Sequence, residues 1–317
     1  MSDAGGAGAR WSWPDTFAGV IPPLITPLDR AGHVDTAAAR ALVDYTLAGG
    51  CSGLFVVGGC GMGPWLTMAQ RGETIRAMVA AAAGKAPVLV GVMLPGTGPA
   101  REAARQAAAE GADALVVGSP YYYGLDADGQ RRHVEAVLAA VDLPVLLYNI
   151  PQCTRHGLHE AVAALAREPQ VLGIKDSSGD LAGFQRFLSI KGQRPDFGVL
   201  QGDERVMAAS LLAGGDGLIP GLANVAPHVF VDLARAARLG DIPACQRLQE
   251  RITDLWSLFA HGHDQPLAAL VSACAVLGLG SGQPVEPYAR LGGEQQQAVA
   301  AILHRHGLRE AATAGRA

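Results

Sequence analysis

The chain repeats a short apolar run followed by an Ala- and Leu-rich stretch about once every thirty residues. The apolar runs have the length and β-branched composition of strands, and the stretches between them have the period of amphipathic helices. The runs are residues 20–26, 53–59, 87–94, 114–119, 144–150, 171–175, 197–202 and 217–221. Eight strand-and-helix units in succession predict an α/β fold, a (β/α)8 TIM barrel.

The apolar runs are continuous rather than alternating in hydrophobicity. This pattern indicates strands that are buried on both faces, as in a parallel sheet covered by helices. A doubly wound sheet is the competing architecture, and it would normally carry a G-x-G-x-x-G loop after its first strand. The glycines of 58–63 instead follow the second run, and Pro64 stands where the third glycine would fall. The barrel is therefore preferred.

The predicted barrel occupies residues 15–226. Residues 227–309 contain several helical stretches without intervening strands, which predicts a C-terminal helical region packed on the barrel and contributing to subunit contacts. Residues 1–14 and 310–317 are expected to be flexible tails, because chain ends are poorly ordered unless they are tied down.

Apolar residues make up 49% of the chain and charged residues 17%, as a large buried core requires. The formal net charge of -4 provides no general attraction to nucleic acid or to an anionic membrane. The five cysteines include no CxxC pair, so neither a disulfide framework nor a zinc site is expected. We therefore expect a small-molecule partner and no nucleic-acid partner.

Neither the N-terminal residues nor the longest apolar stretch indicates export or membrane insertion. Residues 1–10 are rich in Gly and Ala and lack the charged and apolar regions of a signal peptide. The apolar stretch 266–280 is too short to span a bilayer. Odd, widely spaced cysteines fit reduced thiols. The sequence therefore predicts a cytoplasmic protein with no membrane partner.

The sixth predicted strand ends abruptly on Lys175. An ammonium group near a barrel core is costly unless it is paired, and a desolvated lysine amine is a better nucleophile toward carbonyl groups. A Schiff-base nucleophile is therefore one interpretation of Lys175. The alternative is a lysine that extends into solvent or pairs with Asp176.

Two tyrosine-bearing strand ends accompany Lys175. The fourth predicted strand leads into residues 119–123, which contain three tyrosines, and the fifth ends at Tyr148 and Asn149. Catalytic side chains of such barrels come from the C-terminal ends of several strands, so these residues are expected to converge. A tyrosine can carry protons to and from a substrate, although a tyrosine at a strand end can equally be rim packing.

At these positions the chain resembles the dihydrodipicolinate synthase and N-acetylneuraminate lyase family of class I, pyruvate-type aldolases. The resemblance covers nearly the whole chain. The matching stretches are residues 19–28, 120–122, 148–151, 173–180 and 212–224. Together they are highly specific, although any one alone would not be.

The resemblance implies roles for particular residues. Lys175 would form the imine with a pyruvate-like 2-oxo acid, and Tyr148 would relay protons. Tyr122 would reach across a subunit contact to that relay, and Ile219 would provide a backbone contact to the bound oxo acid. The resemblance also implies no cofactor, an aldehyde as a second substrate, and a homo-oligomer, either a tetramer or a dimer.

One departure from the family lies after the second predicted strand. Family members carry a Gly-Thr-Thr-Gly-Glu type of loop, whose hydroxyl groups bind the substrate carboxylate and complete the proton relay. Here the loop is Gly58-Gly59-Cys60-Gly61-Met62, without either hydroxyl or the glutamate. Backbone N–H groups at Gly59, Cys60 and Gly61 can still bind a carboxylate. Water or Cys60 replaces the lost hydroxyl link, or the chemistry has changed.

A second departure follows the fifth predicted strand. The synthases place an arginine two residues after the proline, where it binds the carboxylate of the semialdehyde substrate, but Cys153 stands there. Either Arg155 replaces that guanidinium or its side chain is solvated. An efficient dihydrodipicolinate synthase is therefore not expected. The alternatives to an aldolase are a 2-oxo sugar-acid dehydratase and a catalytically altered oxo-acid-binding or scaffold protein.

The sequence contains one cluster of potential metal ligands, His261-Gly262-His263-Asp264. It lies in the C-terminal helical region, away from the strand ends, and such spacings are common by chance. No metal site is therefore expected.

We predict that Lys175→Ala abolishes the adduct trapped by borohydride in the presence of pyruvate, because no other lysine ends a predicted strand. Lys85 precedes the third strand, and Lys191 lies between the sixth and the seventh. Peptide mass mapping of the reduced protein locates the adduct. An unchanged adduct in the variant would rule out the imine at Lys175.

Overall fold

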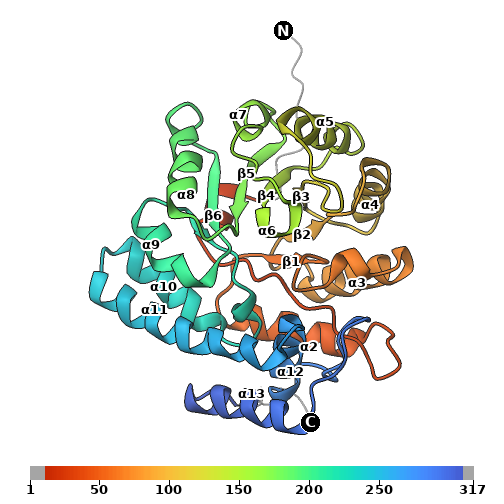
Figure 1. Cartoon of the computed structure of the whole chain (residues 1–317), viewed down its shortest axis with the longest axis vertical. Coiled ribbons are helices and arrows are strands. Elements are labelled where there is room, and N and C mark those ends of the chain that lie inside the picture. The colour runs from red at the N-terminus through yellow and green to blue at the C-terminus, as the bar shows by residue number, and fades with distance from the viewer. Residues whose placement is uncertain (1–10, 310–317) are drawn as a thin grey trace.

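The computed structural model describes residues 11–309. Seven parallel strands form one sheet in chain order, and the sheet curls into a barrel surrounded by helices (Figure 1). The strands are β1 (Leu54–Val56), β2 (Val88–Gly91), β3 (Ala114–Gly118), β4 (Val145–Asn149), β5 (Val171–Asp176), β6 (Gly198–Gln201) and β7 (Gly217–Leu218). The predicted TIM barrel is confirmed.

The segment predicted as the first strand closes the barrel without forming a regular strand. Val20 makes a parallel bridge to Leu218 of β7, and Pro23 makes one to Phe55 of β1. Pro22 and Pro23 have no backbone N–H, so this segment cannot form a continuous ladder with either neighbour. Seven strands and one bridged segment therefore take the eight predicted positions.

Helices follow the strands around the outside of the barrel (Figure 1). They are α2 (Thr36–Ala48), α3 (Met68–Ala82), α4 (Thr97–Ala109), α5 (Ala127–Leu138), α6 (Pro151–Thr154), α7 (Val162–Leu165), α8 (Leu181–Leu188) and α9 (Met207–Leu212). Short 3-10 turns add η1 (Gly63–Trp65), η2 (Ser189–Gly192), η3 (Glu204–Val206) and η4 (Gly221–Asn224). Asp or Thr side chains accept hydrogen bonds from first-turn N–H groups of α2, α3, α5 and α8, which satisfies part of each helix terminus.

Side chains of successive strand residues point alternately into the barrel and toward the helices. In β1, Phe55 belongs to the inner cluster, whereas Leu54 and Val56 belong to the layer beneath the helices. The inner cluster comprises Phe17, Ile21, Phe55, Leu89, Met93, Ala114, Val116, Leu146, Tyr148, Leu200 and Ile219. Both faces of the strands are therefore buried, as their continuous apolar runs predicted.

Part of the tail expected over residues 1–14 is packed on the barrel. Residues 1–10, like 310–317, lie outside the described residues, but Trp11 Nε1 donates to Asp113 Oδ1 (2.8 Å). Helix α1 (Trp13–Phe17) follows, and its Phe17 packs in the inner cluster against Gly198 and Gly217, the first residues of β6 and β7. This helix therefore fills the N-terminal end of the barrel.

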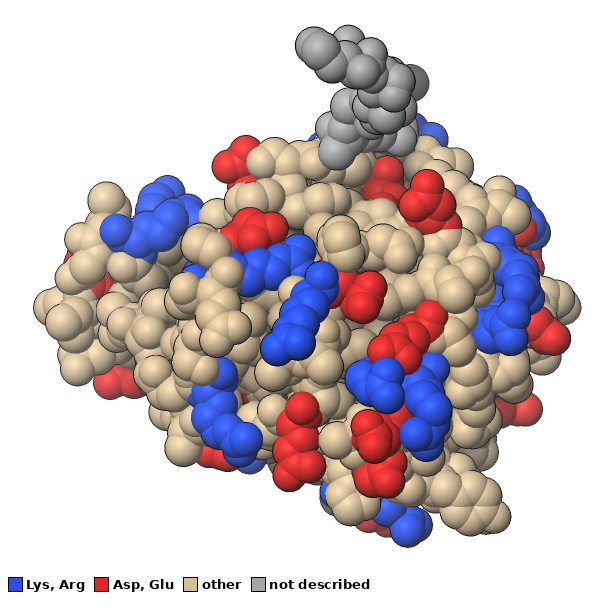
Figure 2. Space-filling view, turned by 90° about the horizontal axis from the view of Figure 1, so that it is seen from above, with Lys and Arg blue, Asp and Glu red and all other residues tan. Residues whose placement is uncertain are grey.

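The C-terminal helices form a group on one side of the barrel. They are α10 (Pro227–Arg238), α11 (Ile242–Trp256), η5 (Ser257–Gly262), α12 (Pro266–Val276) and α13 (Gly293–Arg305). Figure 1 shows them in cyan and blue beneath the barrel and next to α2. No helix among residues 11–309 is long and apolar enough to cross a membrane. On the face shown in Figure 2, acidic and basic residues are interspersed rather than gathered in one patch.

Asn224 links the closing segment to the end of β7. Its buried side chain accepts a hydrogen bond from Ile25 N (3.0 Å) and donates to Pro23 O (2.9 Å) and Gly221 O (2.7 Å). The side-chain amide thus provides bonds that the proline-containing segment does not obtain from a ladder.

We expect Asn224→Ala to lower the free energy of unfolding by about 1–3 kcal/mol or more, because the buried Ile25 N–H loses its acceptor. Urea denaturation followed by circular dichroism measures the change. Gln193→Ala removes an exposed amide with no side-chain hydrogen bond and should stay within about 0.5 kcal/mol of the parent. Equal stability of the two variants would show that Asn224 does not hold the closure.

Candidate active site

Lys175 lies near the C-terminal end of β5, with its side chain at the mouth of the barrel. The residue is 3% exposed, and its Nζ lies 4.3 Å from the centroid of the Tyr148 ring and 5.1 Å from that of Phe55. Tyr148 is its neighbour in register on β4. Within the described residues, no carboxylate forms an ion pair with this amine. Lys175 is therefore a buried amine that neither reaches bulk solvent nor pairs with Asp176.

Asp176 is occupied elsewhere because successive strand residues face opposite sides. Its carboxylate accepts hydrogen bonds from Asn149 Nδ2 (2.7 Å), Ser178 N (3.1 Å) and Ser178 Oγ (3.0 Å). Burial raises the pKa of Asp176, and these donors oppose the shift. These hydrogen bonds hold the loop after β5 in place, and Lys175 takes no part in them.

Lys175 opens onto a cavity of about 670 Å³ at the C-terminal ends of the strands. Its walls come from the strand ends, from the loop after β1 and from the start of α12. The lining residues are Pro23, Gly59, Cys60, Tyr148, Ile150, Gln152, Cys153, Lys175, Ser177, Gly202, Asp203, Glu204, Arg205, Ile219, Gly221, Trp256, Phe259, Ala260, Pro266 and Leu267. Of the predicted site residues, Lys175, Tyr148, Gly59, Cys60 and Ile219 thus surround one space.

Glu204, which the sequence analysis missed, is a buried acid in this cavity. Its Oε1 accepts a hydrogen bond from Leu222 N (3.2 Å). Burial raises the pKa of Glu204, whereas backbone N–H groups and the positive charge of Lys175 lower it. The signal available in the sequence was its place directly after the seventh predicted strand, since strand ends supply the site in such barrels.

The cavity also contains a guanidinium group that is already paired. Arg205 donates from Nε and Nη2 to the two oxygens of Asp203 (2.9 and 2.5 Å). It also stacks over Trp256, with 5.7 Å from its guanidinium carbon to the ring centroid. Burial alone would raise the pKa of Asp203, but Arg205 lowers it below its usual value. This pair adds no net charge to the cavity.

The loop after β1 has an unusual backbone. Val57 and Met62 adopt φ of 55° and 51°, which is rare for any non-glycine residue and strained for a β-branched one. A Cβ on Gly63 would lie 2.0 Å from Val57 O, so only glycine permits this close turn. Gly61 O accepts the Thr26 hydroxyl (2.7 Å). The loop is held in one compact conformation at the cavity.

A buried arginine holds this loop from behind. Arg71 is fully buried, and its guanidinium donates to Gly63 O (3.0 Å) and Gly91 O (2.6 Å). Burial lowers the pKa of Arg71 to about 10, and it still carries its charge at neutral pH. Arg71 therefore joins the loop to the end of β2.

Cys60 is a thiol on this loop at the wall of the cavity. Burial raises its pKa to about 12, while the charge of Lys175 lowers it and that of Glu204 raises it. The thiol therefore stays protonated at neutral pH and is a poor nucleophile.

A second cavity of about 410 Å³ adjoins the first and is apolar. The two share Gly59, Tyr148, Ile150, Cys153 and Leu267. The residues that line only the second are Met62, Pro64, Trp65, Met93, Ser119, Tyr121, Thr154 and Tyr288. None of the described residues that line it is charged, so it suits a less polar group.

Three predicted site residues line neither cavity, and they are Gly61 of the loop after β1, Tyr122 and Arg155. Tyr122 is 66% exposed and packs edge to face on Tyr123, whereas its neighbour Tyr121 lines the apolar cavity. Arg155 is exposed and lies beside Gly124, so its side chain does not replace the missing guanidinium next to Cys153 in this single chain.

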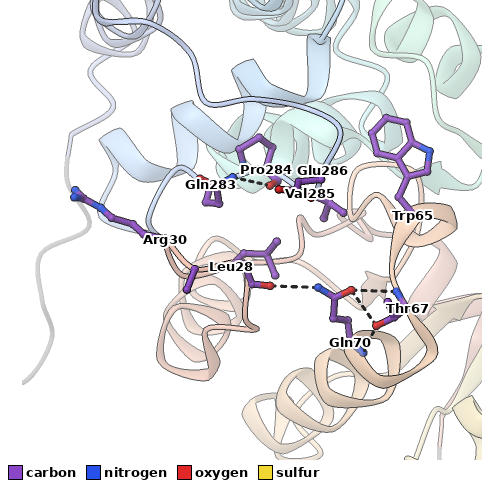
Figure 3. A pocket seen from close by; sticks show the side chains of 11 residues that line it. Leu28, Arg30, Trp65, Thr67, Gln70, Gln283, Pro284, Val285 and Glu286 are labelled. Atoms are coloured by element: carbon purple, nitrogen blue, oxygen red, sulfur yellow. Dashed lines mark hydrogen bonds between the residues drawn. The ribbon is translucent and has the colours of Figure 1, made fainter.

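A third cavity, of about 510 Å³, is polar and contains none of the predicted site residues. It lies between residues 28–32, the start of α3 and residues 283–286 (Figure 3). Gln70 donates to Gly32 O (3.2 Å) and accepts from Thr67 N (3.1 Å). Within residues 11–309, no group of three or more His, Cys, Asp or Glu side chains could hold a metal ion.

Comparison with known proteins gives consistent matches over most of the chain. The model of the Dihydrodipicolinate synthetase family matches residues 16–306. A 4-hydroxy-tetrahydrodipicolinate synthase of Salinibacter ruber is 35% identical, over 87% of this chain and 89% of the relative. A probable 2-dehydro-3-deoxy-D-pentonate aldolase of Escherichia coli is 33% identical, over 86% and 90%. The structure of an E. coli prophage protein of the dihydrodipicolinic acid synthase family, in complex with pyruvate, has a TM-score of 0.86 at 29% identity, covering 92% and 98%.

We predict that Glu204→Gln changes how stability depends on pH. A raised pKa means that the stability from protonated Glu204 is present below the unfolded value of about 4.3 and is lost as the pH rises through the folded pKa. Glutamine stays neutral and can still accept from Leu222 N. The variant should therefore gain stability relative to the parent across that window, by about 1.4 kcal/mol for each unit of pKa elevation.

Urea denaturation from pH 4 to pH 8 measures this difference. Glu250→Gln, at an exposed position of α11, is the matched control and should follow the parent at every pH. Parallel curves for Glu204→Gln and the parent would show that burial does not raise the pKa of Glu204.

Proposed function

Because this chain belongs to the dihydrodipicolinate synthetase family, we propose that it is a class I lyase or aldolase whose Lys175 forms an imine with a pyruvate-like 2-oxo acid. The observation that carries the proposal is the Lys175 amine itself. It is buried, unpaired among the described residues, open to a cavity of about 670 Å³, and close to the phenol ring of Tyr148. A desolvated amine with a neighbouring acid/base group is the arrangement that imine formation needs.

The proposed chemistry uses the imine as an electron sink. Nζ attacks the carbonyl carbon C2 and forms a C–N bond, and the carbinolamine then loses its oxygen as water. The protonated imine accepts the electron pair released when a C3–H or C3–C4 bond breaks, and the enamine results. Tyr148 would carry the protons. The step leads to carbon–carbon bond formation or retro-aldol cleavage, according to the direction of the reaction.

Backbone N–H groups are the proposed binding site for the carboxylate of the oxo acid. The N–H groups of Gly59, Cys60 and Gly61 make no hydrogen bond with another residue among 11–309, and Gly59 and Cys60 line the cavity. Consecutive free N–H groups form a concave site for an anion. Ile219 lines the same cavity and would contribute its backbone to the bound acid.

The second substrate is proposed to be larger or less polar than aspartate semialdehyde. Cys153 stands where the synthases have an arginine, Arg155 lies away from the cavities, and Arg205 is paired with Asp203. A carboxylate on the aldehyde would thus be desolvated without a free cation, which is costly. The apolar cavity lined by Met62 and Trp65 favours a different group.

We also propose that the working protein is a homo-oligomer. Tyr122 and Tyr123 expose 66% and 74% of their surface, which is unusual for a pair of large aromatic rings. In a dimer or tetramer Tyr122 would enter the neighbouring subunit's site and reach its proton relay.

The prediction is tested by assaying retro-aldol cleavage across a panel of 4-hydroxy-2-oxo acids, together with synthase activity on aspartate semialdehyde. We expect pyruvate to form the imine, cleavage to favour apolar partners, and the semialdehyde reaction to be slow. The comparison variant is Gly59→Thr/Cys60→Thr, which restores the two hydroxyl groups. Its new side chain at position 59 has room, because no atom lies within 4 Å of a Cβ built there.

Robust synthase activity of the parent on aspartate semialdehyde would overturn the proposed substrate preference. Loss of water from a panel member, without release of pyruvate, would instead indicate the dehydratase. Failure to bind any oxo acid would favour a binding or scaffold protein.

A further inference from the structure

The hydroxyl of Tyr148 has one hydrogen-bond partner within residues 11–309, and it is not on the loop after β1. Ser177 Oγ lies 3.4 Å from Tyr148 Oη. This distance is long for two hydroxyl groups, but catalytic hydrogen bonds are often long before substrate binds and shorten in the complex. Ser177 directly follows β5, so this contact does not involve the loop after β1.

Ser177 is placed for this contact by its backbone and by the strand. Its N–H donates to Asn149 O (2.9 Å), and its carbonyl accepts from Gln152 Nε2 (2.8 Å). It directly follows the last residue of β5, and both Ser177 and Lys175 line the cavity. Ser177 is 7% exposed and lines the cavity.

Gly202 shows how close Ser177 and Lys175 are. A Cβ on Gly202 would lie 2.2 Å from Ser177 Oγ and 2.6 Å from Lys175 Cε. Any side chain there would collide with both groups, so the serine hydroxyl and the lysine chain meet above this glycine. Ser177 Oγ therefore lies near the end of the Lys175 side chain as well as near the Tyr148 phenol.

We propose that Ser177 supplies the hydroxyl that completes the proton relay of Tyr148, in place of the hydroxyl groups missing from the loop after β1. The inference rests on the proposed imine chemistry at Lys175. Ser177 acts through Tyr148 and does not act on the substrate itself, so it is a positioning residue. Gly59 offers no side chain for this role, and among residues 11–309 no hydrogen bond joins Cys60 to the Tyr148 hydroxyl.

The relay balances protons in both steps. In imine formation, Tyr148 gives its proton to the carbinolamine oxygen, the C–O bond breaks and water leaves. The phenolate that remains accepts a hydrogen bond from the Ser177 hydroxyl. In enamine formation, a C3 proton passes to the phenolate while its bonding pair moves toward the imine nitrogen. The proton then leaves through Ser177 to water, and the reverse sequence returns a solvent proton to C3.

The test uses pyruvate alone, so that no aldehyde is needed. Proton NMR in D2O follows the replacement of the methyl hydrogens of pyruvate by deuterium in the full-length protein. We expect Ser177→Ala to slow this exchange about 10- to 100-fold, less than the loss of a whole acid/base group. The pyruvate concentration for half-maximal exchange should change little, because the proposed binding site for the carboxylate is on the loop after β1.

Four further variants separate a relay from a merely structural role. Ser177→Thr keeps the hydroxyl and should restore most of the rate, and Ser177→Cys, of similar size, should give an intermediate rate. Ser178→Ala removes a neighbouring hydroxyl that bonds Asp176 instead, and should exchange at the parent rate. In a Tyr148→Phe background, Ser177→Ala should have no further effect, because the two residues act as a unit.

The outcomes distinguish this inference from the proposed function. If the parent shows neither exchange nor a borohydride-trapped adduct, the imine chemistry itself is wrong. If the parent exchanges and Ser177→Ala exchanges equally fast, the relay is wrong and the imine chemistry stands. A slowed Ser177→Ala that Ser177→Thr does not rescue, or effects that multiply with Tyr148→Phe, would also overturn the relay. Normal exchange with weaker binding of a hydroxylated substrate would assign Ser177 to substrate binding.

Discussion

The barrel closes because a segment with two consecutive prolines is held between β7 and β1. Pro22 and Pro23 have no N–H groups, so bridges at Val20 and Pro23 replace a continuous ladder. The buried amide of Asn224 supplies three further hydrogen bonds. This closure brings the loop after β1 next to the end of β7. Without it, the loop glycines and Ile219 would not share a cavity with the lysine of β5.

Within that cavity, charge is arranged around one buried amine. Lys175 packs against the rings of Phe55 and Tyr148 rather than against a carboxylate. The neighbouring acid, Glu204, has a pKa raised by burial, and Asp203 is neutralised by Arg205. An amine that is not locked in an ion pair remains able to react with a carbonyl group. Among the described residues that line the cavity, the only other cation is Arg205, which is paired with Asp203, so a carboxylate on the second substrate would lack a free cation.

The loop after β1 has a strained backbone, and its residues 58–62 carry no hydroxyl or carboxylate side chain. Val57 and Met62 occupy the left-handed region, and the buried guanidinium of Arg71 holds the loop to β2. Such strain persists only where surrounding structure enforces it. Within residues 11–309 the loop leaves the N–H groups of Gly59 and Cys60 without a hydrogen bond to another residue at the cavity, and residues 58–62 carry no hydroxyl group. The hydroxyl that contacts Tyr148 belongs to Ser177, after β5.

Periodic apolar runs determined the barrel, because strands buried on both faces and separated by helical stretches have few other ways to pack. The position of Lys175 at a strand end predicted a site at the C-terminal ends of the strands. The sequence could not show that Tyr122 points away from its own cavity while Tyr121 lines one, since both follow the same strand. Nor could it show that Arg155 lies beside Gly124, or that Ser177 and Lys175 meet above Gly202. Local patterns specify strands and helices through repeated burial, whereas the direction of a loop side chain depends on contacts between segments far apart in the chain, and only the tertiary structure decides those.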